Sequence, residues 1–218
     1  TASMTLSSIN FAECHLGPKA AAEVAKVCAA SAALTSLTIN STGNMRNQKV
    51  YTLTAGEQTL DLSRKNLGPA DVKLLSKWMQ RPEVSAALTS LTIAQNTIGE
   101  HGAKSLAESF ASSSLQWITI GSEFTRIPVH NTEITSLDVS DQKFGPSEAI
   151  IVGGAIQFSA ALTSLTLDQN GGIFGELNQY GRVKTPEKHA AKAQPFFDAI
   201  KASRLTSLSL SGTCMGPV

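Results

Sequence analysis

One seven-residue phrase recurs almost verbatim along this chain, and it limits the possible folds more than any other feature. It stands at 33–39 as ALTSLTI, at 87–93 as ALTSLTI and at 161–167 as ALTSLTL. Weaker copies lie at 134–139 and 205–210, and aligning on the phrase recovers three further units at 6–11, 57–62 and 115–120. Such self-similarity predicts an array of about eight similar units rather than one unrepeated globular core.

The residues within and after the phrase have separable physical roles. Apolar residues at its first, fourth and sixth positions are expected to point inward and stack on the equivalent residues of the next unit. The short strand is expected to pair in parallel with its neighbours, which satisfies its backbone groups. An Asn or Cys follows where the chain turns away, at Cys14, Asn96 and Asn170, and an Asn side chain there is expected to bond the main chain of the turn.

Helical patterns follow the turn in four units. We predict helices over 19–30, 69–79, 100–110 and 146–158, and Pro18, Pro69 and Pro146 stand at first-turn positions, where proline is tolerated. A strand of ~5 residues and a helix of ~12 give a unit of the ~28-residue class. Three units depart from this pattern, over 43–58, 121–133 and 171–186, and we expect these segments to be excursions on the edge or the helix side. A helix over 187–202 is expected after the last of them.

The unit LTSLTIAQNTIGEHGAKSLAESF, residues 88–110, resembles a leucine-rich repeat of the ribonuclease-inhibitor subclass. The resemblance covers nearly the whole chain, apart from the three irregular units. It implies an α/β fold, a curved, right-handed leucine-rich-repeat solenoid with a parallel β-sheet on its concave face and helices on its convex face. It also implies a binding role, as in ribonuclease inhibitor, the sensor regions of intracellular immune receptors and the Ran GTPase-activating protein.

Charge and hydropathy exclude several classes of protein. The formal net charge is +1, so the chain lacks the basic footprint of a nucleic-acid binder. No apolar stretch approaches the ~20 residues that a membrane-spanning helix needs, and no signal peptide is recognisable. Because the chain starts at Thr1 and stops just after a strand, we expect a single domain over 1–218 that is part of a longer array or a truncated chain.

The cysteines and histidines do not suggest a redox or metal centre. The three cysteines, Cys14, Cys28 and Cys214, form no CxxC pair, which favours free thiols in a reducing compartment. We therefore expect an intracellular protein, cytoplasmic or, if a leader was removed before Thr1, located in an organelle. No nucleophile–base pair, metal-ligand spacing or phosphate loop is visible, so we expect no catalytic residue, no metal and no cofactor.

On the concave strand face that the resemblance implies, the expected side chains are mostly Ser and Thr. Asp61, Asp138 and Asp168 add negative charge to this face, which suits a basic partner or a weak cation site. The alternative, and the more common arrangement, is that they are isolated carboxylates in contact with solvent. Trp117 is the one aromatic residue expected on these strands. It is either an exposed anchor for a partner or buried beneath the irregular segment 121–133.

The long segment 171–186 supplies the best single candidate for a contact. Phe174, Tyr180 and Arg182 lie there in a Gly-rich, otherwise polar setting. Loops carry function more often than the elements they connect, and aromatic and Arg residues are common interface anchors. The alternative is a loop that packs its own aromatics on the neighbouring helix.

Together these observations predict a non-catalytic protein–protein interaction scaffold, possibly one subunit of a larger assembly. The expected partner is another protein or a multi-subunit complex, with no nucleic acid and no membrane span. The alternative is a regulator of a small GTPase that resembles the Ran GTPase-activating protein. A third reading, ice or carbohydrate binding through the Ser/Thr rows, requires a flat sheet.

Overall fold

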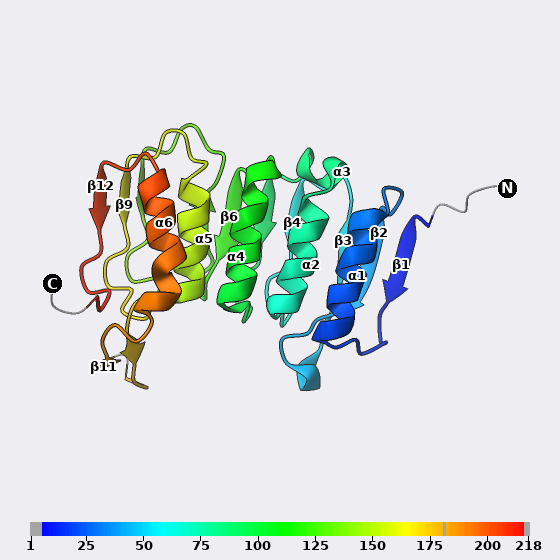
Figure 1. Cartoon of the computed structure of the whole chain (residues 1–218), viewed down its shortest axis with the longest axis horizontal. Coiled ribbons are helices and arrows are strands. Elements are labelled where there is room, and N and C mark those ends of the chain that lie inside the picture. Colours follow the sequence, from blue (N-terminus) through cyan, green and yellow to red (C-terminus); the bar gives the residue numbers. More distant parts are fainter. Residues whose placement is uncertain (1–5, 181, 216–218) are drawn as a thin grey trace.

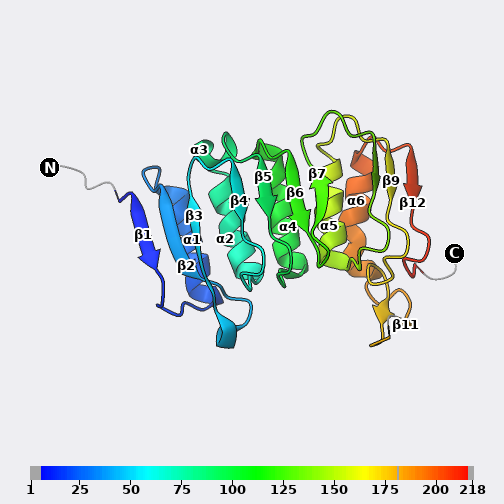
Figure 2. The same ribbon diagram turned by 180° about the vertical axis from the view of Figure 1, so that it is seen from behind.

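A computed structural model describes residues 6–180 and 182–215. The chain forms a mixed α/β structure in which helices line up side by side in one layer and strands form a second layer behind them (Figures 1 and 2). The first and last described strands, β1 (Ser8–Phe11) and β12 (Ser207–Ser209), lie at opposite ends of this row (Figure 1).

The helices and strands alternate along most of the chain. The α-helices are α1 (Pro18–Ala30), α2 (Pro69–Met79), α3 (Pro82–Ser85), α4 (Gly99–Ser109), α5 (Pro146–Ile156) and α6 (Gln194–Ala202), with 3-10 turns η1 (Met45–Asn47), η2 (Phe110–Ser112) and η3 (Ala190–Ala193). The strands are β1 (Ser8–Phe11), β2 (Ser36–Asn40), β3 (Val50–Thr54), β4 (Thr59–Asp61), β5 (Ser90–Thr92), β6 (Trp117–Ile120), β7 (Thr125–Pro128), β8 (Ser136–Asp138), β9 (Ser164–Thr166), β10 (Glu176–Leu177), β11 (Val183–Thr185) and β12 (Ser207–Ser209).

Every copy of the repeated phrase contains a strand, and within each sheet neighbouring copies pair in parallel in the same register. Ser8 lies opposite Ser36 in the β1–β2 pair, and Ser164 lies opposite both Ser136 and Ser207 around β9. In the middle of the row, β4, β5 and β6 pair in parallel, with Leu91 between Leu60 and Ile118. The phrase therefore predicts correctly where the strands lie and how adjacent copies align.

The predicted single parallel sheet of a curved right-handed solenoid is nevertheless wrong. The strands form four separate sheets, in the orders β1-β2-β3, β4-β5-β6-β7, β12-β9-β8 and β10-β11. The three near-identical phrases at 33–39, 87–93 and 161–167 consequently lie in three different sheets. The fold is a mixed α/β arrangement of small sheets, with both parallel and antiparallel pairs.

Two irregular segments cause the separation. After β2 the chain turns back as β3, which pairs antiparallel with β2, and after β6 it turns back as β7, which pairs antiparallel with β6. Each returning strand occupies the edge where the next copy of the phrase would have paired. Of the two expected positions, the edge or the helix side, the structure gives the edge, because 43–58 and 121–133 each contribute the outermost strand of a sheet, β3 and β7. The third segment, 171–186, forms the separate β10–β11 hairpin.

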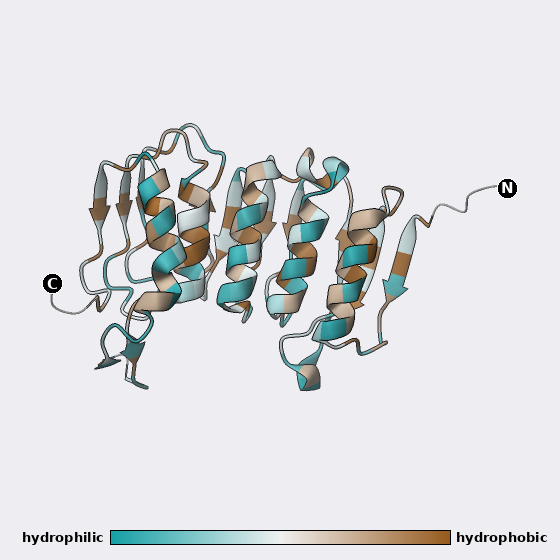
Figure 3. Cartoon of the chain, in the orientation of Figure 1, coloured by the Kyte–Doolittle hydropathy of each residue, from teal (hydrophilic) through white to brown (hydrophobic). Residues whose placement is uncertain are grey.

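A continuous apolar core fills the space between the two layers. The central phrase residues Leu37, Leu91, Ile118 and Leu165 are all fully buried and point toward the helices. The brown segments of the helices and strands in Figure 3 mark this apolar material. Within residues 6–180 and 182–215, no helix combines the length and the apolar character needed to cross a membrane.

The asparagines after the strands join adjacent units, as the sequence predicts. Asn170 accepts hydrogen bonds from the backbone N–H groups of Gln142 and Phe144 at 3.0 Å, and its amide donates to the carbonyls of Val139 and Leu167 at 2.8 Å. Asn96 makes the corresponding bonds to the unit before it. One side chain thereby satisfies donors and acceptors of two successive turns.

Candidate functional site

The face of the β4–β7 sheet that points away from the helices carries the site. Because side chains alternate along a strand, Ser90, Thr92, Trp117 and Thr119 lie on this face while Leu91 and Ile118 lie in the core. The antiparallel register of β6 and β7 sets Trp117 opposite Pro128 and Thr119 opposite Arg126. Arg126 and Trp117 are thus diagonal neighbours on one surface.

Arg126 lies over the indole of Trp117. The guanidinium carbon is 3.8 Å from the ring centroid, which is within the range of a cation–π contact. Trp117 is half-buried and Arg126 is exposed. Within the described residues, Arg126 makes neither a side-chain hydrogen bond nor an ion pair with another protein group, so its donors face solvent.

A second arginine–aromatic pair lies beside the first. The guanidinium of Arg64, in the turn after β4, is 5.1 Å from the ring centroid of Phe124. Arg64 Nε donates to Gln95 Oε1 at 2.9 Å, and Gln95 Nε2 donates to the carbonyl of Ser122 at 3.0 Å. These bonds link three successive turns. We call the surface made by Arg64, Gln95, Trp117, Phe124 and Arg126 the arginine–aromatic face.

The three aspartates of the strand layer are occupied locally. Asp61 accepts from the Ser63 N–H at 2.8 Å, and Asp168 accepts from Ser209 Oγ at 2.6 Å and the Ser211 N–H at 2.8 Å. Asp138 accepts from the hydroxyl and the N–H of Ser140, and these hydrogen bonds lower the pKa of its carboxyl group. Asp61 and Asp138 therefore stabilise the turn at the end of their own strand, whereas Asp168 joins the end of β9 to β12 and the turn after it.

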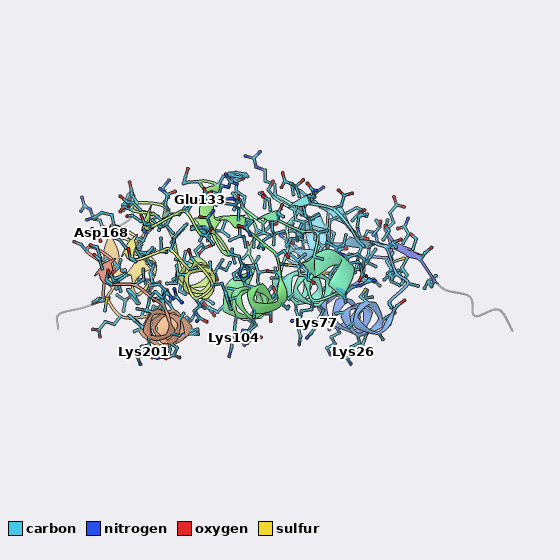
Figure 4. The ribbon with its side chains drawn as sticks, turned by 90° about the horizontal axis from the view of Figure 1, so that it is seen from above. Lys26, Lys77, Lys104, Glu133, Asp168 and Lys201 are labelled. Atoms are coloured by element: carbon cyan, nitrogen blue, oxygen red, sulfur yellow. The ribbon has the colours of Figure 1, made fainter. Side chains whose placement is uncertain are left out.

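Charged residues of the two layers point in opposite directions. Figure 4, viewed from above, shows Asp168 and Glu133 on the strand side, and Lys26, Lys77, Lys104 and Lys201 on the outer side of the helices. Trp117 and Arg126 of this face lie on the outward side of β6 and β7, and Arg64, Gln95 and Phe124 lie in the turns after β4, β5 and β6.

The aromatic residues of segment 171–186 do not gather at one place. Phe174 is 1% exposed and stacks on Phe197 of α6, with ring centroids 5.3 Å apart, so it belongs to the core. Tyr180 is 77% exposed, and Arg182 is exposed beside it in the connection between β10 and β11. The alternative that this segment packs an aromatic on the neighbouring helix thus describes Phe174, while Tyr180 and Arg182 remain accessible.

Within the described residues, no group of three or more His, Cys, Asp or Glu side chains is arranged to hold a metal ion. The three cysteines are free, and burial raises the pKa of the Cys28 thiol, which disfavours the reactive thiolate. The arginine–aromatic face itself offers guanidinium donors and aromatic surface.

Comparison with known proteins adds no relative to this description. Neither a protein-family model nor a curated protein sequence matches this chain.

Arg126 and Arg64 are the residues that sequence reasoning missed. The alternation in Thr125-Arg126-Ile127, where Ile127 is fully buried, is the signal that could have revealed a strand. Pro128 obscured it, because proline argues against a strand unless it lies at an edge, where β7 indeed runs.

Proposed function

We propose that this chain is a non-catalytic protein–protein interaction scaffold that binds its partner through the arginine–aromatic face. The observation that carries the proposal is the Arg126 guanidinium held 3.8 Å from the Trp117 ring, on a sheet face that no helix of the row covers. Arg and Trp are the residue types that most often dominate binding energy at protein interfaces.

The arrangement suits a partner segment that carries carboxylates. The rings of Trp117 and Phe124 fix the planes of the two guanidinium groups, which reduces the entropy lost when these groups bind. Guanidinium donors recognise carboxylates with paired hydrogen bonds. The guanidinium groups of Arg64 and Arg126 are the charged donors of this face, and the carboxylate of Asp61 in the same sheet is bonded to the Ser63 N–H.

Two further features support a binding role. The connection between β10 and β11 adds an exposed tyrosine, Tyr180, and an exposed arginine, Arg182, and β11 lies away from β6 along the row (Figure 1). The resemblance of residues 88–110 to ribonuclease-inhibitor-type repeats favours binding as well, since proteins of that class bind other macromolecules. Membership of a larger assembly remains part of the proposal.

The test is a comparison of surface variants in affinity purification from the source cells. We expect the same partner to co-purify with the unaltered chain and with Lys26→Ala, which changes the opposite side, and to be lost with Trp117→Ala and reduced with Arg126→Ala. A photo-reactive residue at position 119 should cross-link to that partner. Retention by Trp117→Ala, with no cross-link at position 119, would refute this face as the contact.

The same material tests the alternative role as a regulator of a small GTPase. A partner that is a GTPase, and whose GTP hydrolysis rises in the presence of this chain, would replace the scaffold proposal. If Arg126→Ala abolished the stimulation, the arginine would act on the nucleotide rather than on a protein carboxylate.

A further inference from the structure

The helix layer contains one recessed helix. In Figure 4, α5 lies deeper than its neighbours α4 and α6, which form ridges on either side of it. Every residue of α5 from Ala149 to Ile156 is buried, and none of its residues is fully exposed. A helix on the outer layer of such a row ordinarily shows solvent a polar stripe.

Two glycines allow the recess. A Cβ at Gly154 would lie 2.4 Å from the Cβ of Ala107 in α4, and a Cβ at Gly153 would lie 3.1 Å from the Cβ of Ala199 in α6. Small residues on all three helices thus let α4 and α6 close on α5 from both sides. The result is a groove along the outer side of α5, which we call the α5 groove.

The α5 groove is an open cavity of about 340 Å³ with an apolar floor. Ile150 and Gly154, one helical turn apart on α5, form the floor, and the half-buried ring of Phe158 lies toward its end. The corresponding helix α2, between α1 and α4, differs because it exposes Lys73 and Lys77 on its outer side. Figure 3 shows this contrast: beyond its first turn α5 is brown to white, whereas α2 carries teal bands.

Charged residues of α4 and α6, the two walls of the α5 groove, lie on either side of its apolar floor. Glu108 of α4 directly follows Ala107, and Asp198 of α6 directly precedes Ala199, so both carboxylates stand at the level of the paired glycines. Glu108 has no ion pair among the described residues, and Asp198 is 4.0 Å from Lys201. Lys104 lies one turn before Glu108 on the same wall, so one cation and two anions line the groove.

We propose that the α5 groove binds an amphipathic helix of a partner protein that carries apolar anchors and a basic residue beside them. Apolar side chains one turn apart on that helix would sit on Ile150 and Gly154, and a Lys or Arg would pair with Glu108 and Asp198. The walls are helices whose backbone groups are already bonded, so a strand could not add by main-chain pairing, whereas a helix fits between parallel ridges.

A second copy of this chain is a poorer occupant. Helix α1 exposes Val27 beside Lys26, but Lys26 is paired with Glu23 at 2.7 Å, and Val27 is the one large apolar side chain exposed among the described residues of α1. Helix α2 exposes Lys73 and Lys77. Its apolar residues Val72, Leu74 and Leu75 are fully buried, so the face carries no anchor for the groove floor. The proposal concerns the side opposite the arginine–aromatic face, so it can succeed or fail independently of the function proposed above.

The test uses two synthetic peptides and the isotope-labelled full chain. Both peptides have about 18 residues, since shorter helices are marginal in water. They share Leu at helical spacing and differ only in flanking Arg or Glu. We expect the Arg peptide to shift the amide resonances of 104–108, 150–158 and 195–199, and to bind at least roughly tenfold more tightly than the Glu peptide, a difference of ~1.4 kcal/mol.

Two double variants with the same change in net charge complete the test. Glu108→Lys with Asp198→Lys should reverse the preference between the peptides, whereas Glu23→Lys with Glu133→Lys, outside the groove, should leave it unchanged. Failure of the Arg peptide to shift the groove resonances of the unaltered chain would overturn the proposal without any variant. Equal binding of the two peptides by the Glu108→Lys and Asp198→Lys double variant would also overturn it. Self-association of the unaltered chain that only this double variant abolishes would overturn it too, because it would assign the groove to a second copy.

Discussion

The hydroxyl of Tyr51 in β3 donates a hydrogen bond of 3.0 Å to the carboxylate of Asp71 in α2. The same carboxylate accepts from the N–H and hydroxyl of Thr42, at 2.7 and 2.8 Å, and from the N–H of Gly68 at 2.8 Å. Asp71 is fully buried. This one side chain therefore joins the first sheet, the following turn and the start of helix α2, across the point where the strand ladder is interrupted.

Replacement of Asp71 by Ala should be strongly destabilising. It leaves several buried donors without an acceptor, and we expect the free energy of unfolding to fall by about 3 kcal/mol. The matched control is Glu148→Ala, at the equivalent position of α5, because Glu148 accepts only from the Gly145 N–H and should cost about 1 kcal/mol. Urea denaturation measures both, and equal losses would contradict the central role of Asp71.

Tyr51 should make stability fall in alkaline solution. Burial, reinforced by the Asp71 carboxylate, raises the pKa of Tyr51 well above its usual value. In the unfolded chain tyrosine ionises near pH ~10, so stability that is complete below that pH is lost as the pH rises toward the raised folded-state value.

The corresponding measurement is the free energy of unfolding between pH ~9 and ~11, a range that spans the ordinary tyrosine pKa. Tyr51→Phe should flatten the alkaline decline, although it lowers stability at neutral pH by about 1 kcal/mol through the lost hydrogen bond. Tyr180→Phe alters an exposed residue and should leave the decline as it is. Parallel curves for the Tyr51 variant and the unaltered chain would disprove this assignment.

Arg126→Ala should uncover Trp117. The chain has 2 tryptophans, and Trp78 is 0% exposed, so a change in access to a soluble quencher reports on Trp117. We expect a red-shifted emission and stronger acrylamide quenching, because the guanidinium no longer shields the ring. Arg64→Ala, which uncovers Phe124 instead, should change neither property, and an unaltered spectrum for Arg126→Ala would show that the pair does not persist in solution.

Gly154→Ala should strain the packing of α5 against α4. The added Cβ would lie 2.4 Å from that of Ala107, and overpacking of this kind costs about 1–3 kcal/mol. Ala107→Gly alone should cost about 1 kcal/mol as a glycine in a helix. Combining the two should cost less than their sum, because the second change removes the atom that clashes; strict additivity in a double-mutant cycle would argue against close contact.

The local structure could be predicted largely from the sequence. The repeated phrase marks each parallel strand, Pro69 and the apolar spacing after it predict the observed range of α2, and the turn asparagines bond as expected. These features depend on residues close together in the chain or on their repetition. The repeat predicts strand positions and turn hydrogen bonds because equivalent residues in successive units lie in similar surroundings.

The sheet order and the site could not be predicted in this way. The sequence indicates strand and turn at Val50–Thr54, where β3 lies, and no helix over 121–133, but the edge to which each strand adds depends on competition with the next unit. The position of Arg126 over Trp117 follows only from the register of that hairpin. Phe174 similarly owes its burial to Phe197, which comes from a later helix, so its local polar surroundings suggested an exposed residue.

The returning strands β3 and β7 also bear on how such a chain can change in evolution. Among the described strands, no ladder joins β3 to β4 or β7 to β8, so the strands on either side of these junctions do not fix one another's alignment. A duplication or deletion of whole units there would leave the remaining pairs intact. Within β4–β6, the duplication or deletion of a unit would disrupt both the β4–β5 and the β5–β6 pairing. We therefore expect differences in length among descendants of this chain to accumulate between β3 and β4 and between β7 and β8.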